Sequence, residues 1–179
     1  NIKLIKNNYH GPCGAVKTGL EKSETNAMIV YPADDLINGN ILDDMYTLYL
    51  EGYDIVAPSR FMKGGSMKNC PFIKEMIVRF ASFTLFKLSS IPVEDASNGF
   101  RLFSKKIINR FNIESELGFA YSLELLVKAE RNGYKIKQLP SQWLEREIGS
   151  SNFKIFGWLK QYLKWYFYGL LTNFVINKK

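Results

Sequence analysis

The fold prediction rests on one segment, Ala27-Met28-Ile29-Val30-Tyr31-Pro32-Ala33-Asp34-Asp35-Leu36. Its apolar first half is short and ends at a proline, which predicts a buried β-strand followed by a turn. Asp34 and Asp35 then lie where the strand leaves an α/β sheet, and ligands of such sheets bind beyond the carboxyl ends of the strands. Paired carboxylates there suit a hard divalent cation that also binds substrate phosphates. The alternative is that one of them only caps the helix that begins near Asn40.

Length and composition predict one globular domain. The chain has 179 residues, of which 46% are apolar and 15% aromatic, so a hydrophobic core is expected and disorder is not. Two cysteines far apart in the sequence, Cys13 and Cys70, form neither a metal-ligand nor a redox motif, and a reducing compartment is expected. The single histidine, His10, argues against a His-based metal site and against a Ser-His-Asp triad.

Positive charge is concentrated in two blocks. The net charge is +7; residues 60–106 hold nine Lys or Arg against three acids, and residues 153–179 hold five lysines and no acid. Such blocks suit phosphate-bearing partners or an anionic membrane surface, although a solvated basic face is the commoner explanation for either block alone. Nucleic-acid binding would rest on charge alone, because no zinc-finger, helix-turn-helix or RNA-reading motif supports it. We therefore expect no nucleic-acid partner.

The rest of the chain alternates strand and helix patterns, which predicts an α/β fold. Strands are expected at 2–5, 27–31, 54–58, 100–103 and 134–140, and helices at 15–22, 41–50, 71–89, after Ser104 and at 121–132. Gly11 and Gly14 let the backbone approach a neighbour or a ligand closely at the start of the first helix. In the helix that begins at Pro71, the apolar residues are expected to belong to the core: Phe72, Ile73, Met76, Ile77, Phe80 and Phe83.

The C-terminal segment, residues 153–179, is predicted to be an amphipathic basic helix. Lys160 and Lys164 share one face, and the segment is rich in amphipathic rings: Trp158, Tyr162, Trp165, Tyr166 and Tyr168. Its longest uncharged run has 13 residues, whereas a membrane-spanning helix needs about 20 apolar residues. This composition favours a helix lying in a membrane interface over one packed on the domain or on a partner subunit.

Several short motifs together resemble the family 2 glycosyltransferases of the dolichyl-phosphate mannose synthase type. The resemblance covers about residues 2–168; each motif alone is weak, and their order and spacing make the match specific. The motifs are Gly11–Gly19, Ala33–Leu36, Asp54–Phe61 with Gly64-Gly65, Glu94–Arg101, Gly118-Phe119 with Glu124, Gly133–Pro140 and Arg146–Ser151.

The resemblance implies a GT-A fold, a Rossmann-like mixed sheet flanked by helices, over residues 1–152. It implies an inverting glycosyltransferase that uses Mg²⁺ or Mn²⁺ to move a sugar from a UDP- or GDP-sugar to a polyprenyl phosphate. The protein would be peripheral or monotopic at the cytoplasmic face of the membrane. The family opens with two further strands, the first ending in Pro-x-Tyr-Asn-Glu, and residue 1 falls where its third strand begins. We therefore expect an N-terminally incomplete domain with little or no activity alone. The alternative is an inactive module that binds a membrane surface or a partner.

The resemblance also implies ligands for the metal and the donor. The family's metal motif, Asp-x-Asp, falls on Ala33 and Asp35, and Asp34 can substitute for the missing first aspartate. Asp35 and Asp34 are therefore the expected metal ligands. The expected donor-binding residues are Gly11, Gly14 and Asp34.

Basic residues are expected to bind the phosphates, because arginine binds phosphate in a bidentate manner. The candidates are Arg60, Lys74, Arg79 and Arg146, and the resemblance adds Ser151, which matches the family's serine after Arg-x-x-Gly. Asp95 is expected to orient a sugar hydroxyl or the acceptor, so the expected catalytic residues are Asp95, Arg60 and Arg146. Two simpler roles stay open: Arg79 as a helix-surface cation and Asp95 as a turn cap.

Overall fold

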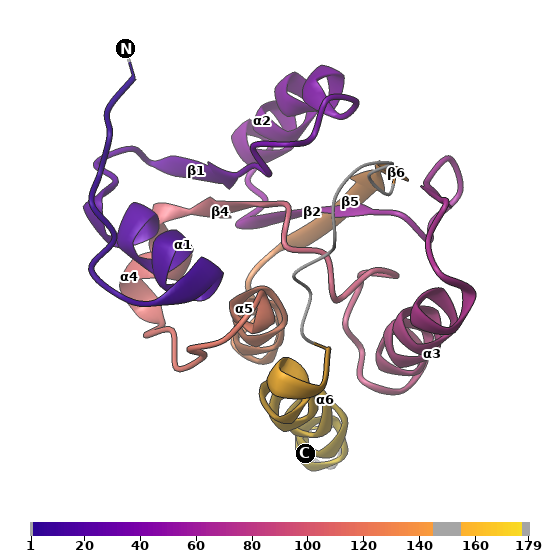
Figure 1. Ribbon diagram of the computed structural model, residues 1–179. Helices are drawn as coiled ribbons and strands as arrows, with labels where there is room; N and C mark the ends of the chain where they lie inside the picture. Colours follow the sequence, from indigo (N-terminus) through magenta and orange to yellow (C-terminus); the bar gives the residue numbers. More distant parts are fainter. Residues whose placement is uncertain (1, 145–154, 177–179) are drawn as a thin grey trace.

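The computed structural model describes residues 2–144 and 155–176 and is built around a four-stranded mixed sheet (Figure 1). The strand order is β1-β4-β2-β5; β4 runs antiparallel to β1 and β2, whereas β2 and β5 are parallel. A second sheet pairs two short strands, β3 and β6, in parallel. The bounds of the strands are Ala27–Val30 for β1, Ile55–Ser59 for β2, Ser66–Lys68 for β3, Arg101–Ser104 for β4, Ile136–Pro140 for β5 and Gln142–Leu144 for β6.

Helices lie on both faces of the four-stranded sheet. In Figure 1, α2 lies on one face, with the short 3₁₀ helix η1 before it, and α1, α4 and α5 lie on the other, where α6 packs on α5 and α3. The bounds are Gly11–Lys22 for α1, Gly39–Ile41 for η1, Leu42–Leu50 for α2, Phe72–Leu88 for α3, Lys105–Arg110 for α4, Ala120–Arg131 for α5 and Ile155–Ile176 for α6. This arrangement confirms the predicted α/β class, a mixed sheet flanked by helices.

The two central strands hold the core together. Every residue of β2 and β4 is buried, and their side chains alternate between the two faces, as the pleat requires. Ile55 and Phe103 face a large cluster that includes α5, whereas Val56 and Leu102 face a smaller one with Met45 of α2. The end of β2, where the predicted site begins, is therefore anchored from both sides.

The strand predicted at 2–5 is wrong. These residues are extended but belong to no strand, and the side chains of Ile2 and Leu4 are fully exposed. An alternating pattern shows which residues could share a face, but a strand forms only where a neighbour supplies hydrogen bonds. The sequence prediction also missed β3 and β6, which are three residues long and pair across more than 70 residues.

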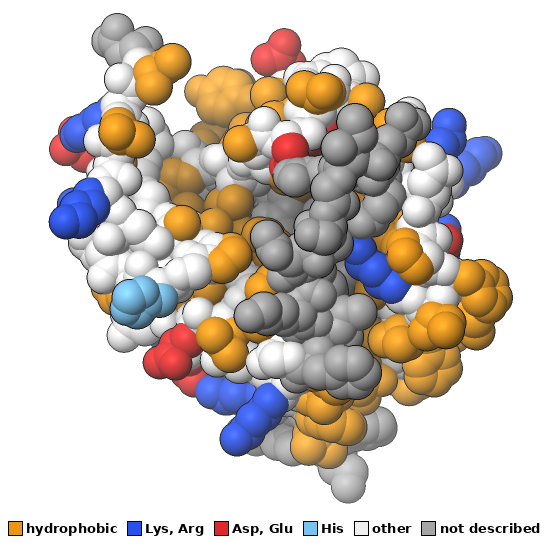
Figure 2. Space-filling view, in the orientation of Figure 1, with side chains coloured by type: hydrophobic (Ala, Val, Ile, Leu, Met, Phe, Trp, Pro, Cys, Tyr) orange, Lys and Arg blue, Asp and Glu red, His pale blue; other side chains and the backbone are white. Residues whose placement is uncertain are grey.

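The predicted core role of the apolar residues in α3 is also wrong. The side chains of Phe72, Ile73, Met76, Ile77, Phe80 and Phe83 are 53–74% exposed, and the buried residues of α3 are Ser82 and Leu85. Figure 2 shows hydrophobic side chains gathered on the side where α3 lies. Helical spacing predicts that residues share a face, but not what covers that face. We call these six residues the α3 apolar face.

The C-terminal helix is present, and one side of it packs on the domain. Trp165 is buried and donates from Nε1 to Ser115 Oγ at 3.0 Å, and Tyr166 Oη lies 2.8 Å from Thr84 Oγ1 of α3. Some of the rings assigned to a membrane interface therefore contact protein instead. The outer side of α6 exposes other residues: Leu159, Leu163, Phe167, Tyr168 and Leu171. No helix in the described part of the chain is long and apolar enough to cross a membrane.

Candidate active site

A buried ion pair lies directly after β2. Arg60 is 9% exposed and Asp95 is fully buried. Arg60 donates from Nε to Asp95 Oδ2 at 2.6 Å, from Nη2 to Oδ1 at 2.9 Å and from its backbone N–H to Oδ2 at 3.1 Å. The Ser97 hydroxyl donates to Oδ1 at 3.1 Å. An ionised carboxylate has about four acceptor positions, so those of Asp95 are all used within the protein.

Two aromatic rings gather three of the predicted phosphate-binding residues. The Arg60 guanidinium lies 5.2 Å from the Phe61 ring and 5.7 Å from the Trp143 ring. Lys74 Nζ lies 6.0 Å from the Trp143 ring, and the Arg79 guanidinium lies 4.6 Å from the Phe61 ring. The loop after β2, α3 and β6 thus form one basic–aromatic cluster, consisting of Arg60, Phe61, Lys74, Arg79 and Trp143.

The cluster contains two aromatic residues that sequence reasoning did not assign to the site, Phe61 and Trp143. Trp143 was not predicted because β6 was not, and the only signal was an aromatic residue shortly after the strand that ends at Pro140. Arg79 also pairs with Glu75 at 2.7 Å, but both side chains are partly exposed, and such pairs contribute little stability. The alternative predicted for Arg79, a cation on the helix surface, therefore agrees with its partial exposure and its pairing with Glu75.

Two glycines fold the loop after β2 back onto Arg60. Gly64 has a φ of +90°, and Gly65 donates its N–H to Met62 O at 2.9 Å. A Cβ atom on Gly65 would lie 2.5 Å from Ser59 O and 2.8 Å from the Arg60 carbonyl carbon. No side chain fits there without moving the backbone that positions Arg60.

A second arginine holds the turn that carries Asp95. Arg101 is fully buried and donates from Nε to Asn98 O at 2.9 Å and from Nη2 to the carbonyls of Asp95 and Ala96 at 3.1 and 2.9 Å. Its Nη1 is buried without a partner in the described residues. Burial lowers the pKa of Arg101 to about 10, so it stays charged at neutral pH.

The carboxyl group of Asp95 stays ionised. Burial alone would raise its pKa, but the charge and hydrogen bonds of Arg60, with the charge of Arg101, hold the pKa below its ordinary value. One negative charge therefore lies between two buried positive charges.

Asp35 shapes the turn that leads from β1 into η1 and α2. Its Oδ1 accepts the N–H groups of Ile37 and Asn38 at 3.0 and 2.9 Å, and its Oδ2 accepts Asn38 Nδ2 at 2.7 Å. Asn38 in turn exchanges two hydrogen bonds with the backbone of Gln142 in β6. These bonds resemble the capping role that the sequence left open. Because Trp143 is the next residue of β6, they also tie the Asp35 turn to the basic–aromatic cluster.

The predicted metal ligands offer a partial set of donors. Asp34 is exposed, and Oδ2 of Asp35 accepts one hydrogen bond, which leaves it one further lone pair. Within residues 2–144 and 155–176, no group of three or more His, Cys, Asp or Glu could hold a metal ion. Mg²⁺ is commonly bound by one or two carboxylates together with substrate phosphates and water. The residues fit a metal that arrives with a phosphate ligand.

The other predicted site residues lie elsewhere. Gly14 packs against Tyr9, since a Cβ there would lie 2.6 Å from Tyr9 Cβ, and Gly11 is exposed. Both belong to α1, which Figure 1 shows at the opposite end of the molecule from β6 and α3. The structure does not bring them to the cluster. Arg146 and Ser151 lie outside the described residues.

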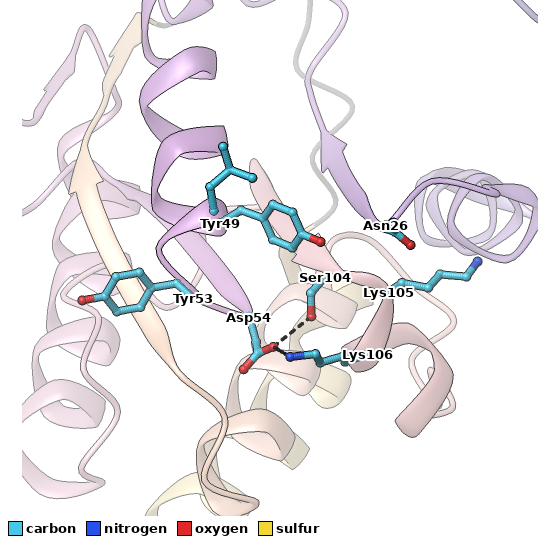
Figure 3. A pocket seen from close by; sticks show the side chains of 9 residues that line it. Asn26, Tyr49, Tyr53, Asp54, Ser104, Lys105 and Lys106 are labelled. Carbon is cyan, nitrogen blue, oxygen red and sulfur yellow. Dashed lines mark hydrogen bonds and ion pairs between the residues drawn. The ribbon is translucent and has the colours of Figure 1, made fainter.

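A cavity of about 380 Å³ lies at the other end of β2 (Figure 3). Asp54 at its wall accepts from Ser104 Oγ at 3.2 Å and lies 3.7 Å from Lys106 Nζ. Tyr49, Tyr53 and Lys105 also line it, and none of the predicted site residues does. Four of the predicted residues, Arg60, Lys74, Arg79 and Asp95, thus gather near the carboxyl end of β2 rather than at this cavity.

The fold and the cluster define a class: an α/β protein with a basic site at the carboxyl end of a strand, suited to anions. The family model of glycosyl transferase family 2 matches residues 1–111. That match covers well over half of the chain, and the chain belongs to glycosyl transferase family 2.

Three curated proteins are similar to the chain over part of their length. Polyprenol monophosphomannose synthase of Mycolicibacterium smegmatis is 24% identical over 102 residues, 56% of this chain and 38% of that protein. Dolichol-phosphate mannosyltransferase of Pyrococcus furiosus is 26% identical over 175 residues, 92% and 48% of the two chains. An uncharacterised protein of Methanocaldococcus jannaschii is 27% identical over 146 residues, which are 77% of this chain and 59% of that protein. The chain spans about half the length of these relatives.

Replacing Gly65 by alanine should displace the loop that positions Arg60. The new methyl group meets backbone rather than a flexible side chain, so we expect a loss of about 1–3 kcal/mol in the free energy of unfolding. Urea denaturation measures it. The matched control is Gly19→Ala in α1, where a Cβ meets nothing within 4 Å and alanine should stabilise the helix by about 0.5–1 kcal/mol. Equal stability of the Gly65→Ala variant and the parent protein would contradict the account of this loop.

Proposed function

We propose that this chain forms part of an inverting glycosyltransferase that moves a sugar from a nucleotide-sugar donor to the phosphate of a polyprenyl phosphate. The basic–aromatic cluster carries the proposal, because it gathers three cations beside the α3 apolar face. Membership of glycosyl transferase family 2 supports the class of reaction. Two relatives are named for polyprenol monophosphomannose synthesis and dolichol-phosphate mannosyl transfer, which supports the kind of acceptor.

The cluster suits an acceptor phosphate on chemical grounds. A phosphate monoester is ionised at neutral pH, so its oxygen can attack the anomeric carbon without a strong general base. The bond from that oxygen to the carbon forms as the bond to the donor's diphosphate breaks, and attack from the opposite side inverts the configuration. The protein then has to orient the acceptor and balance its charge, which Arg60, Lys74 and Arg79 can do. Trp143 and Phe61 restrict the positions of these cations.

Asp35, with Asp34, would hold Mg²⁺ or Mn²⁺ together with the donor's diphosphate. The metal would supply Lewis-acid stabilisation of the charge that develops on the departing diphosphate. The hydrogen bonds of Asp35 to the backbone fix its carboxylate in the turn after β1, and the link from Asn38 to β6 fixes that turn relative to the cluster.

We also propose that α3 and the outer side of α6 lie in the membrane interface at its cytoplasmic face, as in a peripheral or monotopic protein. The α3 apolar face and exposed apolar residues of α6 such as Leu163, Phe167 and Leu171 would enter the lipid, while the exposed Lys87 and Lys160 on the same two helices carry positive charge. Because Lys74 and Arg79 belong to α3, the acceptor's phosphate could reach the cluster while its hydrocarbon chain stays among the lipids.

An inactive module with the same fold is the second candidate. The alanine at position 33 and the hydrogen bonds that already occupy much of the Asp35 carboxylate favour it. Such a module would bind lipid surfaces but no nucleotide.

Lys74 is expected to contribute to acceptor binding. In the full-length protein, Lys74→Ala should raise the KM for farnesyl phosphate about tenfold and leave the donor KM unchanged, since a charge-assisted hydrogen bond is worth about 1.5–3 kcal/mol. Initial rates of sugar transfer measure both constants. Lys22→Ala, an exposed lysine in the last turn of α1 and so far from α3, is the control and should change neither. Equal effects of the two variants would contradict the assignment.

Metal-dependent nucleotide binding separates the enzyme from the inactive module. Calorimetry of the full-length protein with UDP and with GDP should show binding of one nucleotide that strengthens when Mn²⁺ is added. Asp35→Asn removes the charge but keeps an acceptor oxygen for the turn, so it should abolish the manganese effect. Asp43→Asn, an exposed acid in the first turn of α2, should leave it intact. Absence of nucleotide binding in the parent protein would favour the module.

Membrane binding should depend on the α3 apolar face. Phe72→Ser with Phe80→Ser should lower partitioning onto vesicles of phosphatidylcholine and phosphatidylglycerol at least tenfold, because each ring buries a large apolar area in the interface. Vesicle flotation measures it. The control is Tyr46→Ser with Leu50→Ser on α2, which are also exposed but lie on the other face of the sheet. Unchanged flotation of the α3 variant would refute the proposed orientation.

A further inference from the structure

We infer that Asp95 is a positioning residue for the acceptor phosphate: it holds the Arg60 guanidinium by two of its nitrogens and leaves the third, Nη1, to bind the ligand. This inference rests on the proposed function, because it places the phosphate at Arg60. It also replaces the role expected for Asp95 from the sequence, direct orientation of a sugar hydroxyl or of the acceptor.

The hydrogen bonds of Asp95 account for the change of role. Its two oxygens accept three donors of Arg60 and the hydroxyl of Ser97. A substrate hydroxyl could bind only by displacing one of these, and Asp95 is fully buried. Asp95 therefore acts through the residue it holds.

The hydrogen bonds of Arg60 leave one edge of its guanidinium for a ligand. Nε and Nη2 are bound to Asp95, and Nη2 also donates to Ser97 Oγ at 3.0 Å. In the described part of the chain, Nη1 has no hydrogen-bond partner, and it is not among the buried polar atoms that lack one. The Phe61 and Trp143 rings lie near the same group. An arginine fixed before its ligand arrives loses less side-chain freedom on binding than a mobile one.

The charges around Asp95 favour an incoming anion. Asp95 lies between Arg60 and Arg101, so the three buried side chains carry one net positive charge. A buried charge without full compensation is unfavourable, and a phosphate bound at Arg60 would supply negative charge. Arg101 also clamps the carbonyls of the turn, and Asn98 Nδ2 donates to Pro58 O at 2.9 Å, which ties that turn to β2. The position of Asp95 relative to Arg60 is thus fixed by two strands.

A double-mutant cycle tests the inference. In the full-length protein, calorimetry measures the affinity for farnesyl phosphate of the parent, Arg60→Ala, Asp95→Asn and the double variant. We expect Arg60→Ala and Asp95→Asn each to weaken binding about tenfold or more, and the double variant to bind no worse than Arg60→Ala alone. In transfer assays, Asp95→Asn should raise the KM for farnesyl phosphate and leave the donor KM unchanged. An ion pair that only supported the fold would not separate the two constants.

Glu94→Gln is the matched control. It makes the same change of acid to amide at the neighbouring position, but Glu94 accepts from Gln138 Nε2 at 3.1 Å, and no arginine among residues 2–144 and 155–176 binds it. Its affinity for farnesyl phosphate should stay within twofold of the parent's.

The outcomes distinguish this inference from the proposed function. If Arg60→Ala weakens binding and Asp95→Asn does not, the positioning role of Asp95 is wrong and the acceptor site stands. If Arg60→Ala binds farnesyl phosphate as tightly as the parent, the acceptor site at the cluster is wrong, and the positioning role with it.

A milder variant keeps the test decisive if Asp95→Asn does not fold, as judged by circular dichroism. Ser97→Ala removes one donor to Asp95 and one acceptor of Arg60 while the carboxylate stays charged. It should weaken the binding of farnesyl phosphate two- to fivefold, and an unchanged affinity would overturn the inference.

Discussion

The ion pair between Arg60 and Asp95 fixes the end of β2, and the arrangement of the candidate site depends on it. Arg60 binds the carboxylate of Asp95 and Arg101 binds its backbone carbonyl, so the turn after residue 94 must keep Asp95 between the two guanidinium groups. Removing one partner of such a pair leaves a buried charge without compensation, which makes this geometry costly to change. The loop that follows Arg60 can close over it only because residue 65 is a glycine.

The α3 helix joins the basic site to an exposed apolar surface. The first half of the helix supplies Lys74 and Arg79 to the cluster. The α3 apolar face is exposed along the helix, beside the outer side of α6. A ligand with a phosphate head and a hydrocarbon chain has the same two parts. The phosphate of the proposed acceptor therefore matches the basic–aromatic cluster, and its hydrocarbon chain matches the α3 apolar face. The two relatives named for polyprenol and dolichol phosphates are similar to this chain.

The sequence predicted the elements of the fold better than their surroundings. The strands that begin near Ala27 and Asp54 and the helix that begins at Pro71 follow from local periodicity and turn residues. The exposure of Phe72 and its neighbours does not, because burial depends on which elements come to lie against a face. The clustering of Arg60 with Lys74 followed from the resemblance to a family, whereas Trp143 lies on a short strand that only its long-range partner defines. Likewise, the hydrogen bonds that fill the acceptor positions of the Asp95 carboxylate come largely from Arg60, which lies 35 residues away in the sequence.

A crystal structure of the full-length protein with bound farnesyl phosphate would test the central claim most directly. The account predicts the phosphate at the basic–aromatic cluster, with one oxygen within hydrogen-bond distance of Arg60 Nη1 and the hydrocarbon chain directed along α3. A phosphate bound instead at the cavity lined by Lys105 and Lys106, at the other end of β2, would contradict it.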